Sequence, residues 1–254
     1  MRRLLYWYVP LVVAIAATAV FAAGFYSFVS GDVGTPVDLV LPTRSGPAPT
    51  APAQQSLVTP IILGDSLARG AGDTTGLGIG GRLDQELRRR NIHANRTVNI
   101  AINGARAPDV LRQLQSRNVQ TILAESNVII LSVGGNDLWG VNDWRKRPPP
   151  DKFMDAVLDR VASVVDRIRA VNPRARIFFI GLYNPFWKTP AGGVLTALVN
   201  RWNAKLIERF GSDVNLTVVQ TSDIIANHNR LAFDQFHPGD EGYALIARRI
   251  ADAI

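Results

Sequence analysis

The chain has 254 residues, of which 47% are hydrophobic, 19% charged and 8% aromatic, and its formal net charge at pH 7 is +7. It contains no cysteine, which excludes a disulfide scaffold, a thiolate metal cluster and a cysteine nucleophile. The hydrophobic content excludes a wholly disordered chain. The charged fraction is below the roughly 25% usual for soluble domains, which indicates that part of the chain is not ordinary globular surface.

Residues 1–29 predict a membrane anchor. The run from Leu4 to Val29 has no charged residue, and as a helix rising about 1.5 Å per residue it would measure roughly 39 Å, enough to cross a hydrocarbon core of about 30 Å. Two arginines precede the run and favour a cytoplasmic N-terminus. We therefore expect a single-pass protein of the cell membrane whose later residues are extracytoplasmic. The alternative is a signal peptide cleaved near Ala22 and Ala23, which would make the chain secreted.

Residues 30–57 predict a proline-rich linker, because five prolines lie among Gly, Ser, Thr and Ala with little apolar periodicity. The alternative is a poorly ordered terminus of the domain that follows. Residues 58–254 are long enough for one domain with its own core. The first 56 residues contain three arginines and two aspartates, so the remainder carries +6 of the net charge. No nucleic-acid-binding motif accompanies this charge, so we expect anionic lipids or wall polymers nearby and no nucleic-acid partner.

Short apolar or β-branched runs alternate with longer segments of helical spacing in this domain. Helical periodicity is clearest from Phe153 to Ile168, and further helices are expected over residues 108–114, 194–210 and 241–250. The alternation predicts an α/β fold with a parallel sheet covered on both faces. The expected strands are residues 59–63, 97–102, 127–133, 176–182 and 215–219.

Polar residues follow three of the expected strands directly. They are Gly64–Leu67 after the first strand, Asn103-Gly104 after the second and Gly134–Asp137 after the third, while Asp234 and His237 lie just before the last helix. In parallel sheets ligands bind beyond the carboxyl ends of the strands. We therefore expect these residues to lie on one rim of the sheet.

The residue types on this rim suit acyl transfer. A serine hydroxyl needs a base to remove its proton, and the base works best when a third group orients it; Ser66, His237 and Asp234 supply the three types. The reaction also develops an oxyanion that needs preorganised donors. The backbone N–H groups of Ser66 and Gly104 and the side-chain amide of Asn136 are suitable donors.

The pattern of these residues resembles that of the SGNH hydrolases, also called the GDSL esterase/lipase family. The matching blocks stand in the family's order and are Ile62–Leu67, Asn103-Gly104, Gly134–Asp137 and Asp234–His237. The resemblance implies a flavodoxin-like three-layer α/β/α sandwich with a five-stranded parallel sheet. It also implies hydrolysis of acyl esters, with substrates that range over lipids, thioesters and acetylated sugars, and no metal or other cofactor.

Carried over by position, the resemblance implies that Ser66 is the nucleophile and also donates its N–H to the oxyanion hole. Gly104 and Asn136 complete that hole, His237 is the base and Asp234 is the orienting acid. Each block has a plainer explanation when taken alone. Ser66 can cap a helix, Gly104 and Asn136 can form turns, and Asp234 with His237 can be a surface pair.

Two further patterns are weaker. Gly76, Gly78 and Gly81 fit G-x-G-x-x-G but do not follow a strand, so dinucleotide binding is not expected. We expect residues 70–81 to form a mobile loop beside Ser66 that shapes access to it. Four aromatic residues either line an acyl or sugar site or cover the core, namely Trp139, Trp144, Phe186 and Trp187.

The leading hypothesis is a membrane-anchored, extracytoplasmic serine ester hydrolase that acts through an acyl-enzyme on a lipid, such as a lysophospholipid, or on an acetylated glycan. The alternative is a noncatalytic cell-envelope module that binds glycan or lipid without cleaving it. Transfer of the acyl group to a sugar instead of water also passes through an acyl-enzyme and stays open. The sequence does not specify acyl length or oligomeric state.

Overall fold

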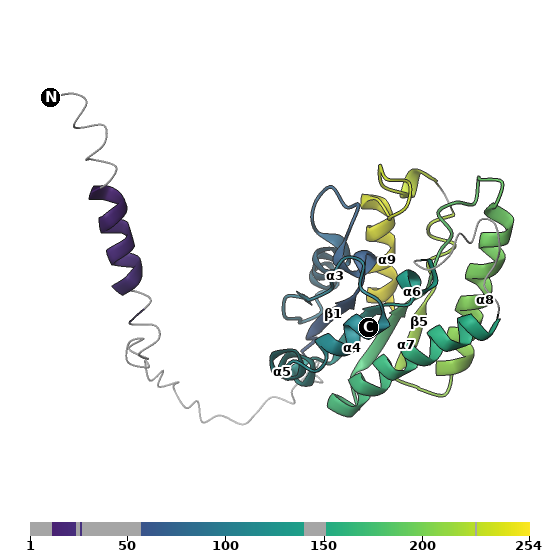
Figure 1. Cartoon of the computed structure of the whole chain (residues 1–254), viewed down its shortest axis with the longest axis horizontal. Coiled ribbons are helices and arrows are strands. Elements are labelled where there is room, and N and C mark those ends of the chain that lie inside the picture. The colour runs from purple at the N-terminus through teal and green to yellow at the C-terminus, as the bar shows by residue number, and fades with distance from the viewer. Residues whose placement is uncertain (1–11, 24–25, 27–56, 140–150, 227) are drawn as a thin grey trace, which may run out of the picture. The chain divides into compact units, whose positions relative to one another are not determined.

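The computed structural model describes residues 12–23, 26, 57–139, 151–226 and 228–254 (Figure 1). The predicted anchor, residues 1–29, and the predicted linker, residues 30–57, lie largely outside these ranges. Residues 12–23 and Tyr26 are helical. In the part of the chain that the structure describes, no helix is both long and apolar enough to cross a bilayer.

Five parallel strands form a single sheet in the order β2-β1-β3-β4-β5, as predicted in number and direction. Every residue of β1 and of β3 is buried, because helices cover both faces of the sheet, and such strands are continuously apolar. The strands are β1 (Pro60–Gly64), β2 (Val98–Asn99), β3 (Val128–Ser132), β4 (Arg176–Ile180) and β5 (Leu216–Val219).

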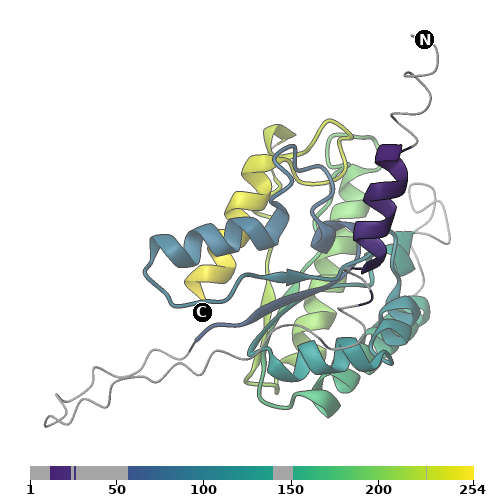
Figure 2. The same cartoon turned by 90° about the vertical axis from the view of Figure 1, so that its left-hand side faces the viewer.

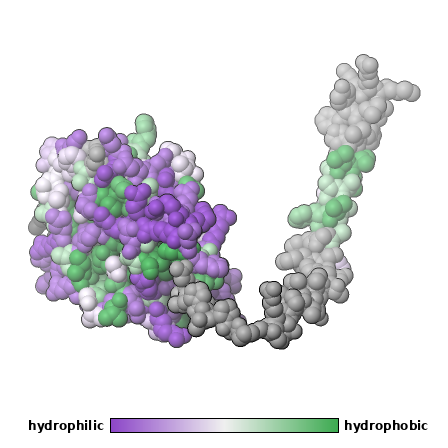
Figure 3. Space-filling model, turned by 180° about the vertical axis from the view of Figure 1, so that it is seen from behind, coloured by the Kyte–Doolittle hydropathy of each residue, from purple (hydrophilic) through white to green (hydrophobic). Residues whose placement is uncertain are grey.

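Helices form a layer on each side of this sheet. One face packs against α2 (Ser66–Arg69), α3 (Gly78–Arg89) and α9 (Asp240–Asp252), and Figure 2 shows α3 and α9 side by side. The other face packs against α4 (Ala107–Gln113), α5 (Arg117–Glu125), α6 (Gly135–Trp139), α7 (Asp151–Val171) and α8 (Gly192–Phe210). A short 3₁₀ helix, η1 (His228–Arg230), precedes α9. Hydrophilic residues dominate the face of the domain that is seen in Figure 3.

The prediction of a loop over residues 70–81 is wrong for its last four residues, because α3 begins at Gly78. A methyl group on Gly80 would lie 3.2 Å from Thr97 Cγ2 and 3.3 Å from Ile62 Cδ1. The absence of a side chain at Gly80 therefore lets α3 approach the sheet closely. Glycine here serves helix–sheet packing.

Strand β2 is shorter than the expected residues 97–102. The backbone N–H groups of Ile100 and Ile102 still donate to the carbonyls of Ile62 (3.0 Å) and Gly64 (2.9 Å). The chain therefore continues alongside β1 beyond the regular strand and delivers the next loop to the carboxyl edge of the sheet.

Candidate active site

Ser66 is placed by the tight junction between β1 and α2. Gly64 has φ +127°, and a methyl group there would lie 1.8 Å from the Ser132 carbonyl oxygen, so glycine is required where β1 passes β3. Asp65 is the N-cap of α2 and accepts a hydrogen bond from the Leu67 N–H (3.1 Å). Ser66 is consequently the first residue of α2, at the carboxyl end of a central strand.

The carboxylate of Asp65 is buried beneath this junction. It accepts a 2.8 Å hydrogen bond from the Ser132 hydroxyl at the end of β3. Burial raises the pKa of Asp65 to about 6, although hydrogen bonds from Ser132 and from the Ala68 and Leu67 N–H groups act in the opposite direction. Asp65 thus joins the ends of two strands below Ser66.

His237 lies on a short closed loop, residues 231–239. Leu231 pairs with Pro238 in an antiparallel bridge, and the Ala232 N–H donates to the His237 carbonyl (2.8 Å). Burial raises the pKa of Tyr183 well above its ordinary value, so its hydroxyl stays protonated and donates to the Phe236 carbonyl (2.8 Å). We call this segment the histidine loop.

The first half of the predicted mobile loop packs against the histidine loop. A methyl group on Gly72 would lie 2.9 Å from His237 Cβ and 2.8 Å from the Pro238 carbonyl oxygen. Thr74 donates from its N–H (2.8 Å) and its hydroxyl (2.7 Å) to the carboxylate of Asp240. Residues 70–77 are therefore tied to the segment that carries the histidine.

Three side chains form a continuous line of hydrogen bonds. Asp234 Oδ2 lies 2.6 Å from His237 Nδ1, and His237 Nε2 lies 2.8 Å from Ser66 Oγ. Partial burial acts to raise the pKa of Asp234, but hydrogen bonds from the His237 ring and from the Phe236 and His237 N–H groups outweigh it, so this pKa lies below its usual value. The carboxylate is held charged against the imidazole.

Asn136 lies on α6, beside the loop that follows β2. Its Nδ2 donates to the Ala105 carbonyl (3.0 Å), which leaves the second hydrogen of the amide available. Asp137 Oδ2 accepts a hydrogen bond from the Ala107 N–H (3.0 Å). The loops after β2 and β3 are therefore joined at two points.

A small cavity of about 40 Å³ opens between these groups. Ser66, Asn136 and His237 line it together, whereas Gly104 is not among the lining residues. Gly104 is exposed, with φ +75° and no atom within 4 Å of an added methyl group. The structure thus does not bring Gly104 into the wall of this cavity.

The apolar wall of the cavity includes residues that sequence reasoning missed. Leu182, Tyr183 and Pro185 follow β4, so the rule that pointed to the other three strand ends could have identified them, and Phe236 stands beside His237. Of the four aromatic candidates, Trp139 lines the cavity, Phe186 packs on the core with its ring 5.9 Å from Phe236, Trp187 is exposed, and Trp144 lies outside the described residues.

Comparisons with known proteins identify the family. A model of the GDSL-like Lipase/Acylhydrolase family matches residues 62–245. The protein YpmR of Bacillus subtilis (strain 168) is 28% identical over 202 residues, which cover 76% of this chain and 79% of YpmR.

Solved structures share the fold. The lipase Lip_vut3 from a goat rumen metagenome has a TM-score of 0.65 at 19% identity, over 77% of this chain and 97% of its own. A family 3 carbohydrate esterase of Clostridium thermocellum has a TM-score of 0.59 at 17% identity, over 77% and 94% of the two chains. The acetylxylan esterase Axe2 of Geobacillus stearothermophilus has a TM-score of 0.56 at 16% identity, over 77% and 93%.

These findings confirm the resemblance seen in the four sequence blocks and favour an enzyme over a noncatalytic module. The chain belongs to the GDSL-like lipase/acylhydrolase family and is an ester-hydrolysing enzyme.

Proposed function

We propose that Ser66 is the nucleophile of this enzyme, with His237 as its base and Asp234 as the group that orients the base. The observation that carries the assignment is the line of contacts Asp234–His237–Ser66, at 2.6 Å and 2.8 Å, which ends on the cavity that Asn136 also lines. No other serine in the described ranges has a hydrogen bond to a histidine ring nitrogen.

The reaction then passes through an acyl-enzyme. Ser66 Oγ attacks the ester carbonyl carbon while His237 Nε2 takes its proton, and the imidazolium that results is stabilised by Asp234. The Ser66 N–H lies in the first turn of α2, where it has no partner within the helix, and it donates to the oxyanion together with the free hydrogen of Asn136. The resemblance to the family adds the Gly104 N–H as a third donor, although Gly104 does not line the cavity. His237 returns the proton to the leaving alcohol, and water hydrolyses the acyl-enzyme.

We propose that the acyl group is short. The cavity of about 40 Å³ is small, and its wall is formed by large side chains such as Trp139, Leu182 and Phe236. An acetyl group fits this space, whereas a longer acyl chain would extend out of the cavity. This favours the acetylated glycan over the lysophospholipid among the predicted substrates.

We also propose that residues 1–29 anchor the chain in the cell membrane and that residues 58–254 are extracytoplasmic. The support is the uncharged run from Leu4 to Val29 behind two arginines. The test is protease treatment of intact cells that carry the full chain with a C-terminal tag. Loss of the tag and recovery of the chain in the membrane fraction support the proposal. Protection of the tag contradicts it, and release into the medium indicates signal cleavage.

The catalytic assignment is tested with the full chain and aryl esters of graded acyl length. We expect the rate of hydrolysis to be highest for the acetate ester and to fall as the acyl chain lengthens. We expect Ser66→Ala to be inactive towards all of these esters. Ser163→Ala is the matched control, because Ser163 lies on the exposed side of α7 and should change nothing. A wild-type chain inert towards all the esters, or a Ser66→Ala variant with full activity, would contradict the assignment.

A further inference from the structure

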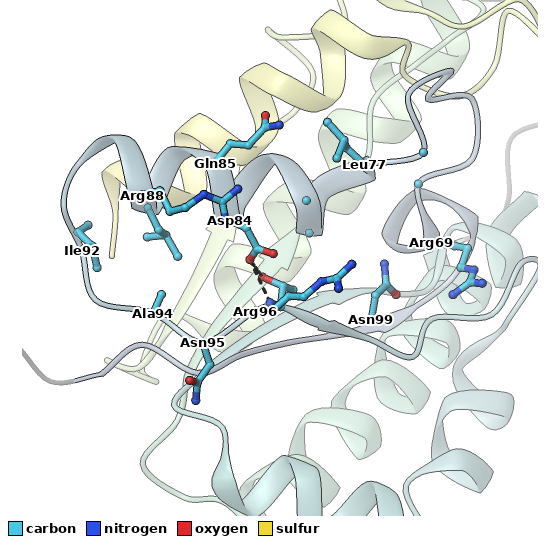
Figure 4. A pocket seen from close by; sticks show the side chains of 16 residues that line it. Arg69, Leu77, Asp84, Gln85, Arg88, Ile92, Ala94, Asn95, Arg96 and Asn99 are labelled. Atoms are coloured by element: carbon cyan, nitrogen blue, oxygen red, sulfur yellow. Dashed lines mark hydrogen bonds between the residues drawn. The ribbon is translucent and has the colours of Figure 1, made fainter.

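A second and larger hollow, of about 700 Å³, lies between α3 and the edge of the sheet at β2. Figure 4 looks into it, with Arg88 and Gln85 on the side of α3 and Arg96 and Asn99 on the side of β2. Arg69, from the end of α2, closes one end. We call this hollow the arginine groove.

The groove is cationic. Its three arginines, Arg69, Arg88 and Arg96, have no carboxylate partner within the described ranges, whereas the other two arginines of α3 each pair with one. The acid in the lining, Asp84, already accepts hydrogen bonds from the Thr97 N–H (3.0 Å) and hydroxyl (2.5 Å). The lining thus carries three guanidinium groups and one carboxylate, a net charge of +2.

Helix α2 links the groove to the active-site cavity, because Arg69 lines the groove and Ser66 lines the cavity. Arg69 is one turn after Ser66 on α2, roughly 5 Å along the helix axis. Asn99, in the floor of the groove, donates from Nδ2 to the Ala68 carbonyl (2.9 Å) and so fixes the floor to α2. From Gly78 to Arg88 the wall formed by α3 extends roughly 15 Å. A chain-like ligand that lies along α3 therefore has one end at Arg69, one turn of α2 from Ser66.

The lining chemistry identifies the class of ligand. Guanidinium groups bind carboxylates and phosphates through paired hydrogen bonds. The amides of Gln85, Asn95 and Asn99 supply donors and acceptors of the kind that hydroxyl groups need. A polar, open groove of this kind suits a sugar chain that carries anionic groups and offers little to an acyl chain.

We propose that the arginine groove binds the anionic chain of an acetylated glycan, whose acetyl ester reaches Ser66. This inference rests on the proposed function, because it assigns the alcohol side of the ester to the groove and the acyl side to the small cavity. It makes Arg88 and Arg96 specificity-determining residues.

Binding is measured without turnover in the full chain carrying Ser66→Ala. The probe is an oligogalacturonate, a sugar chain with one carboxylate per residue, and the readout is calorimetry. We expect the double variant Arg88→Ala/Arg96→Ala to weaken binding by about tenfold or more, because charge-assisted hydrogen bonds are lost. Arg69 is left intact because it stands next to the catalytic turn.

The control is the double variant Arg117→Ala/Arg167→Ala, which removes the same two charges from exposed positions on α5 and α7. It should leave binding unchanged. An equal loss of binding affinity in the control, or no loss of affinity in Arg88→Ala/Arg96→Ala, overturns the proposal. Binding of anionic lipid vesicles that depends on Arg88 and Arg96 while the oligogalacturonate fails to bind also overturns it, and assigns the groove to lipid headgroups.

Acetate release links the groove to catalysis. We compare acetylated polygalacturonate with acetylated xylan, which is neutral, and expect the ratio of their kcat/KM values to fall about tenfold in Arg88→Ala/Arg96→Ala, mainly through KM. An unchanged ratio overturns the inference. If the enzyme hydrolyses aryl acetate but shows no preference for the anionic polymer, the proposed role of the groove is wrong and the proposed function stands. If the enzyme is inert towards all these esters, the proposed function is wrong.

Discussion

The hydroxyl of Ser132 donates a 2.8 Å hydrogen bond to the buried carboxylate of Asp65, one residue before the proposed nucleophile. This contact fixes the end of β1 against the end of β3. It also places an ionisable group where its charged form is poorly solvated, and the pKa of Asp65 rises to about 6 from 3.8.

Asp65→Asn should therefore change stability in a pH-dependent way. Between about pH 4 and 6 the folded chain binds a proton at Asp65 more tightly than the unfolded chain does, so the stability of the wild type falls as pH rises through this window. The amide carries no charge, so the stability of Asp65→Asn relative to wild type should increase by about 2 kcal/mol from pH 4 to pH 7. Urea unfolding at both pH values measures this difference.

Asp223→Asn is the control of opposite sign. The hydrogen bond from Arg249 lowers the pKa of Asp223 despite partial burial, so this carboxylate stabilises the fold above about pH 4 and loses that contribution as pH falls. Its effect should be small, because the side chain is largely exposed. If the difference in unfolding free energy between Asp65→Asn and wild type is the same at both pH values, the pKa of Asp65 is not shifted.

Gly64→Ala should destabilise the chain by about 3 kcal/mol or more. The added methyl group meets the Ser132 carbonyl at 1.8 Å, and the φ of +127° is one that alanine rarely adopts. The measurement is urea unfolding. Gly193→Ala is the control, since Gly193 lies in α8 with nothing within 4 Å of an added methyl group, and it should be neutral or slightly stabilising. Equal effects of the two substitutions would contradict the prediction.

Asn136→Ala should lower kcat on the order of 100-fold while leaving KM for an aryl acetate nearly unchanged, because its amide acts on the oxyanion that exists only after attack. Steady-state kinetics on the full chain separates the two parameters. Because Asn136 also bonds to Ala105, circular dichroism should confirm that the variant is folded. A folded variant with wild-type kcat removes Asn136 from the oxyanion hole.

Activity should be lost at acid pH, because the proposed base, His237, must be neutral to act. Only the neutral imidazole ring can accept the proton of Ser66, so kcat/KM should decline at acid pH. Asp234 keeps its charge to a lower pH than an ordinary carboxyl group, because its pKa is lowered. The pH profile of Asp65→Asn is the comparison, since the pKa of Asp65 is about 6, and this variant should keep the decline at acid pH. A flat profile in the wild type argues against His237 as base.

Much of the sheet and its rim was predictable from local pattern. Strands β1 and β3 are apolar at nearly every position because they are buried on both faces, and the residues after them needed only the rule for the carboxyl ends of parallel strands. Helix α7 was predictable from its stripe, of which Val157, Val161, Val164 and Ile168 are buried.

The missed features depend on contacts between distant segments. Helix α3 begins in a glycine-rich stretch whose purpose, the approach of Gly80 to Thr97 and Ile62, exists only after folding. Helix α5 buries Leu123 alone and so leaves a weak periodic signal. The arginine groove joins Arg69 to Arg88 and Arg96, and nothing in their spacing marks them as neighbours.

The bridge between Leu231 and Pro238 has a consequence for how the enzyme can be controlled. It makes the acid and the base a single rigid pair, since Asp234 and His237 sit within one closed loop. Of the two contacts in the line Asp234–His237–Ser66, only the 2.8 Å link from His237 Nε2 to Ser66 Oγ joins this loop to the start of α2. A displacement of the loop by little more than an atomic diameter would break this hydrogen bond and abolish proton transfer, while the sheet and its core stay intact.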